Sequence, residues 1–321
     1  MQQISIGRSI IQNISQAIGS VPNAENMKSI LSKIPYLRYA YFYRENCAQR
    51  PGHYYSPVVD LADLSARKDT IWKKGKKLPG IDLNTAGQEN VLDQIVAHSQ
   101  KIPFSDNKTQ QYRYYYNNKT YEHADGWVLF GMLNAFRPHR IIEVGSGFSS
   151  ALILDTKDEF LDYPIDLTFI EPNPQDRLTG LLKKDDYKNT TIIKDIVQHV
   201  PPETFQQLEA NDILLIDNSH VSKTGSDVNY LMTEILPVLN KGVIVHIHDI
   251  FYPFEYPEEW LFEHRLNWNE LYCVHNFLLF NNAFKIIFFA DFIQQEYSAV
   301  LQEKVPLFFK GRPGSLWIQR V

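Results

Sequence analysis

Histidine and carboxylate side chains gather at the ends of two apolar segments in the middle of the chain. Asp217 closes the run DILLID at 212–217, and the letters HIHD close the run GVIVHIHD at 242–249. A parallel strand that is buried on both faces is normally apolar throughout, so polar groups at its end indicate a functional reason. His246 and His248 are two residues apart and therefore share one face of an extended strand.

These polar side chains should meet, because ligand sites in open doubly wound sheets lie outside the carboxyl ends of the strands. The set consists of Asp217, Asn218, His220, His248 and Asp249. A neutral histidine can remove a proton from a hydroxyl group, and His220 is our first choice for that base, with His248 next. Alternatively, Asp217 and Asp249 with His248 or Asn218 can bind Mg²⁺ or another divalent cation. Histidines that merely bond to neighbouring loops are the competing interpretation.

A glycine turn follows an apolar run in the segment IIEVGSGFSS at 141–150. Gly145 and Gly147 permit a tight turn, and the backbone amides at the start of a following helix can bind a polar ligand. Glu143 lies inside the strand end, where an uncompensated carboxylate is costly. Ser150 replaces the third glycine of the dinucleotide fingerprint, although an ordinary turn would also fit so short a pattern.

Two acidic residues end the next apolar runs. Glu171 follows LTFI, and an acid at this position can accept hydrogen bonds from both hydroxyls of an adenosine ribose. Asp195 ends the third run and is a weaker candidate for binding the adenine amino group. A cap on the turn after Glu171 and a solvated loop at Asp195 are the structural alternatives.

Short β-branched runs alternate with helical stretches from Arg140 onward, which is typical of βαβ units. We predict an α/β fold with a Rossmann-like, seven-stranded, mostly parallel sheet, helices on both faces and a terminal antiparallel hairpin. Helices are expected near 148–158, 174–183, 201–209, 226–239 and 268–282. The expected strands are 140–144, 167–171, 190–195, 212–217, 242–249, 285–292 and 314–320.

The chain before this alternation has a different composition. Isoleucines at helical spacing in residues 1–33 predict an amphipathic helix, and tyrosines are concentrated in 35–58 and 111–118. We therefore predict a helical segment at 1–110, which covers substrate or joins subunits of a homodimer, before the domain at 111–321. The aromatic residues expected to contact substrate are Tyr116, Tyr252 and Tyr256.

Composition excludes several classes of protein. The 321 residues are 44% hydrophobic and carry a net charge of −5 without a cluster of Lys and Arg, which argues against a nucleic-acid partner. No run reaches the roughly 18 apolar residues of a membrane span. Cys47 and Cys273 form no metal motif, and the first residues lack a secretory pattern, so we expect reduced thiols and a cytoplasmic protein.

The order EVGSG, IE, ID-x-SH and HDI resembles the class I methyltransferases that use S-adenosylmethionine (SAM). Residues 211–257 resemble the bacterial methyltransferase domain 24 branch most specifically, within a resemblance that covers roughly 112–320. The resemblance implies that SAM binds at the glycine turn and the acid after the second strand, in natural-product or glycan pathways. The expected cofactor contacts are Glu143, Gly145, Ser146, Gly147, Ser149, Glu171, Asp195 and Asp217.

The leading hypothesis is methyl transfer to a hydroxyl of a small molecule, a glycan, or a peptide or polyketide acceptor; an amine acceptor is the nearest variant. An NAD(P)-dependent oxidoreductase is the alternative enzyme, and the missing third glycine argues against it. A non-catalytic protein with the same fold is the alternative outside enzymes. His220 and His248 at the strand ends argue against that alternative.

Overall fold

The computed structural model describes residues 43, 46–73 and 75–321. The chain divides into two compact units, Met1–Lys68 and Asp69–Val321, and the second contains the sheet. The helix expected at 1–33 lies outside the described residues. Within the described part of the first unit, Tyr54 and Tyr55 are exposed. No helix in the described part of the chain is long and apolar enough to cross a membrane.

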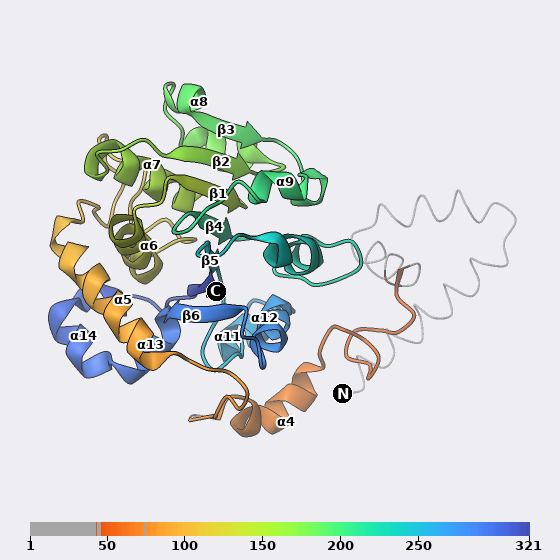
Figure 1. The fold of residues 1–321 in the computed structure, drawn as a ribbon. Helices are drawn as coiled ribbons and strands as arrows, with labels where there is room; N and C mark the ends of the chain where they lie inside the picture. Colours follow the sequence, from red (N-terminus) through yellow and green to blue (C-terminus); the bar gives the residue numbers. More distant parts are fainter. Residues whose placement is uncertain (1–42, 44–45, 74) are drawn as a thin grey trace, which may run out of the picture. The chain divides into compact units, whose positions relative to one another are not determined.

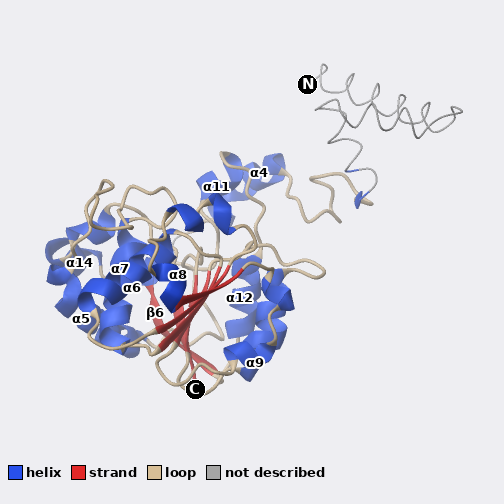
Figure 2. Cartoon of the chain, turned by 90° about the horizontal axis from the view of Figure 1, so that it is seen from above, coloured by secondary structure: helices blue, strands red, loops and turns tan. Residues whose placement is uncertain are grey.

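A seven-stranded sheet forms the centre of the second unit, with helices on both faces, as Figure 2 shows. The strand order is β3-β2-β1-β4-β5-β7-β6. Only β7 runs antiparallel to its neighbours β5 and β6, so the predicted fold class is confirmed. The strands are β1 (Arg140–Val144), β2 (Asp166–Ile170), β3 (Thr190–Ile193), β4 (Ile213–Ile216), β5 (Ile244–Ile247), β6 (Phe284–Phe289) and β7 (Leu316–Arg320).

The central strands are short and buried because helices cover both of their faces. Every residue of β4 and β5 is buried, which explains why these strands are apolar apart from His246. Backbone hydrogen bonds continue one residue beyond three of the strands: Glu171 N donates to Ile193 O, Asp217 N to Val144 O and His248 N to Ile216 O. These polar residues therefore lie together at the carboxyl ends of the parallel strands.

Helices of the second unit surround the sheet, as Figure 1 shows. They are α5 (Thr85–His98), α6 (His123–Phe136), α7 (Phe148–Phe160), α8 (Asp186–Asn189), α9 (Pro202–Phe205), α10 (Asp227–Tyr230), α11 (Glu258–Phe262), α12 (Glu270–Leu278), α13 (Ala290–Glu296) and α14 (Ser298–Lys304). A further helix, α4 (Leu61–Ile71), spans the boundary between the two units.

Three expectations were wrong. The stretch 174–183 forms two short 3₁₀ turns, 226–239 forms α10 followed by a π turn and a 3₁₀ turn, and the expected strand 285–292 ends at Phe289, where α13 takes over. Pro237, which has no backbone donor, lies in the interrupted helix.

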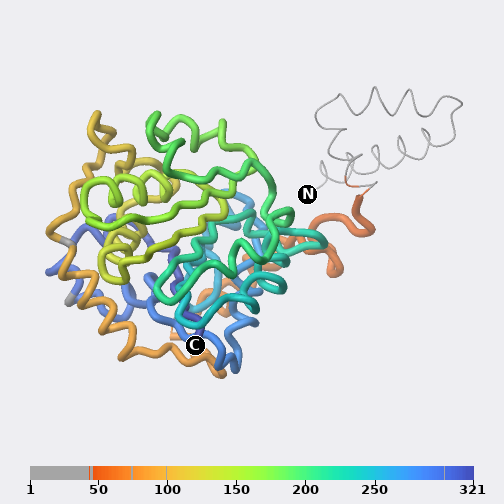
Figure 3. The backbone as a smooth tube through the Cα atoms, turned by 45° about the horizontal axis from the view of Figure 1, so that its top comes forward, coloured from red at the N-terminus to blue at the C-terminus, as the bar shows by residue number. Residues whose placement is uncertain are grey.

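Helix α5, which precedes β1 in the chain, packs on β6, the strand at one edge of the sheet. Figure 3 shows α5, in orange, beside the blue C-terminal part of the chain. The side chain of Gln88 accepts a hydrogen bond from Phe289 N at 2.7 Å, and Asn84 Nδ2 donates to Ile286 O at 2.8 Å. These side chains satisfy backbone groups that an edge strand would otherwise expose.

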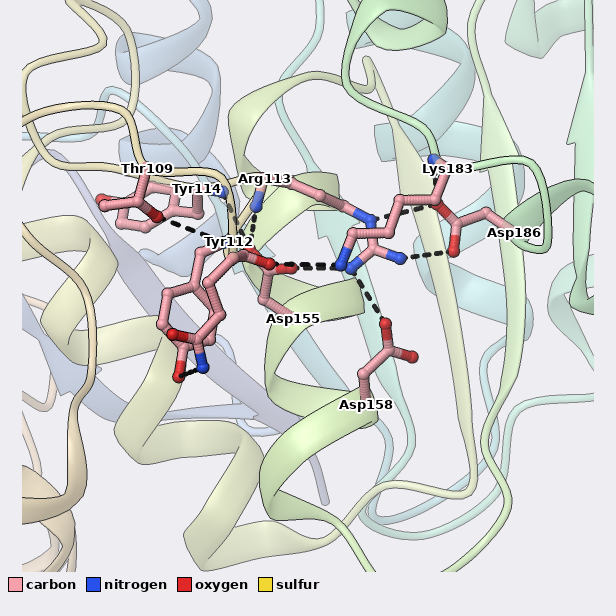
Figure 4. A network of polar contacts seen from close by, with 9 residues as sticks. Thr109, Tyr112, Arg113, Tyr114, Asp155, Asp158, Lys183 and Asp186 are labelled. Atoms are coloured by element: carbon pink, nitrogen blue, oxygen red, sulfur yellow. Dashed lines mark hydrogen bonds and ion pairs between the residues drawn. The ribbon is translucent and has the colours of Figure 1, made fainter.

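A buried arginine fixes the second tyrosine-rich segment to the domain (Figure 4). Arg113 Nη1 lies 2.6 Å from Asp155 Oδ1 and 2.9 Å from Asp158 Oδ2, while Nη2 lies 2.6 Å from Asp186 Oδ1. Asp155 Oδ2 also accepts hydrogen bonds from the backbone amides of Arg113 and Tyr114. The segment is therefore attached to α7 and α8 by charged groups that are largely withdrawn from water.

Replacing Arg113 with Met should destabilise the protein by about 3–5 kcal/mol, because Asp155 and Asp186 would remain buried without their cation. Urea unfolding followed by circular dichroism measures the change. Arg137→Ala is the matched control, since the Arg137–Asp162 pair is exposed, and its unfolding midpoint should stay close to wild type. Equal shifts in the two variants would contradict this view of the Arg113 network.

Candidate active site

The glycine turn after β1 lies directly against the end of β4. Gly145 has a φ of 80°, and a Cβ atom built on it would lie 1.7 Å from the carbonyl oxygen of Asp217. No side chain fits in that space, and the backbone conformation itself favours glycine. Gly145 therefore allows the chain to bring the ends of β1 and β4 together.

Glu143 is fully buried beneath this turn. Ser150 Oγ donates a hydrogen bond to Glu143 Oε2 and accepts one from Gly147 N at 3.0 Å. Burial raises the pKa of Glu143 to about 7, although the hydroxyls of Ser149 and Ser150 partly offset the increase. The serine that replaces the third glycine thus connects the start of α7 to the buried carboxyl group.

Glu171 faces the turn from the end of β2. Its Oε2 atom accepts a hydrogen bond from Ser146 N at 3.3 Å, and its Oε1 atom accepts one from Asn173 N at 2.8 Å. The turn and the acid therefore lie on the same side of the sheet, which is the geometry that a single adenosyl ligand requires.

Two adjoining cavities follow this edge of the sheet. The first, of about 320 Å³, has mainly polar walls, while the second, of about 390 Å³, includes the apolar side chains of Ile196 and Val197. Gly145, Glu171, Asp217 and Asn218 line both. The other described residues of the first cavity are Thr120, Tyr121, Ser146, Gly147, Phe148, Ser149, Asn173, Asp176 and Arg177.

A histidine surrounded by carboxylates lies next to the shared wall. His220 Nε2 is 3.3 Å from Asp217 Oδ1 and 3.5 Å from Asp249 Oδ2, and Nδ1 is 2.9 Å from Glu270 Oε2. Asp217, His220 and Asp249 each offer a ligand atom, and these atoms lie within 4.8 Å of one another. Glu270 Oε1 also accepts a hydrogen bond from Asn218 Nδ2 at 2.9 Å. The predicted convergence of these side chains is confirmed.

The carboxylates control the charge of this histidine. Burial lowers the pKa of His220, but hydrogen bonds to Asp217 and Glu270 and the charge of Asp249 outweigh it and raise the pKa well above 6.5. Burial raises the pKa of Asp217, yet His248 and His220 bring it to about 2. His220 is therefore held as an imidazolium, with Asp217 as an ionised partner.

His246 in β5 and His248 directly after it lie side by side, as their spacing predicts, with ring centroids 5.6 Å apart. His246 is fully buried, and burial together with His248 lowers its pKa well below 6.5, so it is neutral. His248 Nε2 lies 3.6 Å from Asp249 Oδ1, and the ring of Tyr121 is 5.0 Å away. Burial lowers the pKa of His248, but Asp249 and other acids raise it overall.

The remaining predicted site residues lie outside the walls of these two cavities. Tyr116 stacks on His123 with centroids 4.9 Å apart, and Tyr252 packs against Phe292. Asp195 accepts a hydrogen bond from His199 or pairs with it at 2.9 Å, although the next three residues line the second cavity.

Tyr256 belongs to an aromatic group that adjoins the carboxylate cluster. Its ring stacks on Trp260, and Trp268 lies 4.4 Å from the ring of His220. Sequence reasoning missed both Trp268 and Glu270. They follow β5 in a loop and at the start of α12, and no spacing pattern connects them to His220.

Comparison with known proteins identifies the domain. Residues 142–250 match the family model described as a methyltransferase domain. An uncharacterised protein of Archaeoglobus fulgidus is 33% identical over 168 residues, which is 51% of this chain and 75% of that protein. The chain belongs to the family of this archaeal protein, and its residues 142–250 are a methyltransferase domain. The bacterial natural-product branch stays a prediction.

Solved structures with a similar chain path include methyltransferase PaMTH1 of Podospora anserina with bound S-adenosylhomocysteine (SAH). It is 16% identical, with a TM-score of 0.43, over 83% of this chain and 99% of that one. The O-methyltransferase of Bacillus cereus in complex with SAH is 11% identical, with a TM-score of 0.39, over 81% of this chain and 97% of that one.

The buried carboxyl group of Glu143 should make stability depend on pH. Its pKa is about 7 in the folded protein against 4.5 for a free glutamate, so its contribution is complete below pH 4.5 and is lost as the pH rises through 7. Glu143→Gln should remove this dependence, which amounts to about 3 kcal/mol. Urea unfolding at a series of pH values measures it.

Glu263→Gln, a change at an exposed glutamate, is the control and should follow the wild-type curve. Parallel curves for wild type and Glu143→Gln would show that Glu143 ionises normally and would contradict the prediction.

Proposed function

We propose that the protein is a SAM-dependent methyltransferase that methylates a hydroxyl oxygen on a small-molecule acceptor. The observation that carries the proposal is the pair of cavities in the methyltransferase domain, which share Gly145, Glu171 and Asp217. A ligand with two dissimilar ends can extend across both, with its middle beside the shared residues.

The chemistry of the walls suits SAM. Glu171 can bind the ribose hydroxyls, and the apolar side chains of Ile196 and Val197 suit the flat adenine, with Asp195 proposed for its amino group. The methionine part then faces the polar cavity, with Gly145, Ser146, Gly147 and Ser149 around it and Glu143 beneath. SAM carries a sulfonium and an ammonium group against one carboxylate, and a site with several acids favours such a cation.

The same charges disfavour the NAD(P) alternative. A dinucleotide would bring its anionic diphosphate to the glycine turn, where three acids, Glu171, Asp176 and Asp217, line the described wall against one cation, Arg177. Ser150 occupies the position of the third glycine and is engaged with Glu143. The turn is therefore built around a carboxyl group rather than around a phosphate.

Bound SAM supplies an electrophilic methyl group on a positively charged sulfur. The protein aligns the acceptor with it and receives the hydroxyl proton. Glu270 holds His220 Nδ1, which directs Nε2 toward Asp217 and Asp249. Nε2 can accept the proton once the imidazolium has lost its own. His248 is the second candidate for the base.

A divalent cation offers a second arrangement. Asp217, His220 and Asp249 fit Mg²⁺ or another divalent ion, because each directs a ligand atom to one small region. Such an ion would lower the pKa of the acceptor hydroxyl and orient it. His220 would then serve as a ligand in place of the predicted His248, and His248 would be left as the base.

The acceptor is proposed from the aromatic group around His220. Trp260 and Trp268 are half-buried, and their rings suit a flat ring or the apolar face of a sugar, as in a natural product, glycan or modified peptide. Tyr256, proposed as a further contact, is buried and packs against both tryptophans. We retain the proposals that Tyr116 and Tyr252 contact the acceptor and that residues 1–110 cover it or join a homodimer. A cytoplasmic location completes the proposal.

Changing His220 to Ala should lower kcat at least about 100-fold while leaving SAM affinity within a few-fold. Isothermal titration with SAM and SAH, and methyl release onto candidate acceptors, measure the two quantities. In the wild type, kcat/KM should rise with pH, and its acid limb should lie above pH 6.5, because the acids around His220 raise its pKa.

His264→Ala, at an exposed histidine outside the set of proposed site residues, is the control and should retain full turnover. Failure of the wild type to bind SAM or SAH, or binding of NAD instead, would overturn the proposed function. Loss of SAM affinity in His220→Ala without loss of kcat would overturn only the assignment of the base.

The cation arrangement predicts that millimolar Mg²⁺ or Mn²⁺ raises the Tm of the wild type, because a ligand that binds only the folded state stabilises it. Asp249→Asn should lose most of this increase, whereas Asp195→Asn, which changes an acid outside the cluster, should keep it. Differential scanning calorimetry measures the effect. Equal increases in all three proteins would contradict a site at Asp217, His220 and Asp249.

A further inference from the structure

Arg177 lies at the wall of the first cavity, between β2 and β3. Of the described residues that line this cavity, Arg177 is the one with a positive charge, while Glu171, Asp176 and Asp217 are acidic. Its guanidinium forms no hydrogen bond or ion pair with any residue in the described part of the chain. An exposed arginine at the rim of an acidic cavity, free of protein partners, is available to a ligand.

The second glycine of the turn provides the space for this side chain. A Cβ atom built on Gly147 would lie 2.9 Å from Arg177 Cδ and 3.3 Å from Nη1. A side chain at position 147 would therefore crowd the arginine, which lies over the turn.

The start of a helix adds positive potential at the same wall. Gly147 is the N-cap of α7, and the free amides of the first turn and the positive end of the helix dipole lie beside the arginine. Ser146 Oγ is buried in the wall of the same cavity, close enough to Glu143 to lower the pKa of that carboxyl group. An arginine, a hydroxyl and a helix start together form a site for a carboxylate.

We propose that Arg177 binds the carboxylate of the methionine part of SAM and SAH. The inference rests on the proposed function, which brings that end of the ligand to the first cavity. The ammonium group of the same ligand then meets the acidic walls, so the two charges of the amino-acid end have separate partners. Arg177 thereby selects ligands that carry a complete amino acid.

The test compares two ligands on two proteins by isothermal titration. SAH carries the carboxylate, whereas S-adenosyl-3-thiopropylamine keeps the amine and the adenosine but lacks the carboxylate. Wild type should bind SAH about 10- to 100-fold more tightly than the decarboxylated ligand, as expected for one charge-assisted pair. In Arg177→Gln the affinity for SAH should fall by that factor, and the affinity for the decarboxylated ligand should stay unchanged.

Arg177→Lys should recover part of the SAH affinity, since it keeps the charge but loses the planar pair of donors. Urea unfolding confirms that each variant is folded. Equal losses for both ligands, or no loss for SAH in Arg177→Gln, would overturn the inference while SAH binding by the wild type upholds the proposed function. If the wild type binds neither ligand, the proposed function fails and the inference fails with it.

Discussion

The close approach of two backbones determines the arrangement of the site. The turn at Gly145 passes so near the carbonyl oxygen of Asp217 that no side chain could stand between them. Because of this contact, the ends of β1 and β4 form one continuous wall, and both cavities share it. The glycine turn and the carboxylates around His220 are neighbours for the same reason.

Charge in this wall is balanced locally. Burial raises the pKa of Glu143, deep under the turn, to about 7, whereas two histidines lower the pKa of Asp217 and keep it ionised. His220 in turn is charged because acids surround it. Acids in similar positions at adjacent strand ends thus differ in protonation, since one faces serine hydroxyls and the other faces imidazoles.

Much of the sheet and the edge of the site could be predicted from the sequence, because apolar runs of strand length and the polar residues that end them follow from local rules. Parallel strands align those ends, so Asp217, His220 and Asp249 were expected to meet. Sequence reasoning failed where distant segments meet. Glu270 and Trp268 contact His220 because α12 and the loop before it pack there. Arg177 lies beside the glycine turn although it is distant from it in the sequence, and no spacing pattern predicts such a contact.

The side chains of Gln88 and Asn84 on β6 have a consequence for assembly. They form hydrogen bonds with a backbone amide and a backbone carbonyl of this edge strand, and these groups could otherwise pair with a strand of another molecule. Extension of the sheet from one copy into the next is therefore blocked at this border. Stacking of copies into a continuous sheet is therefore disfavoured along β6, whereas β3 forms the opposite edge of the sheet.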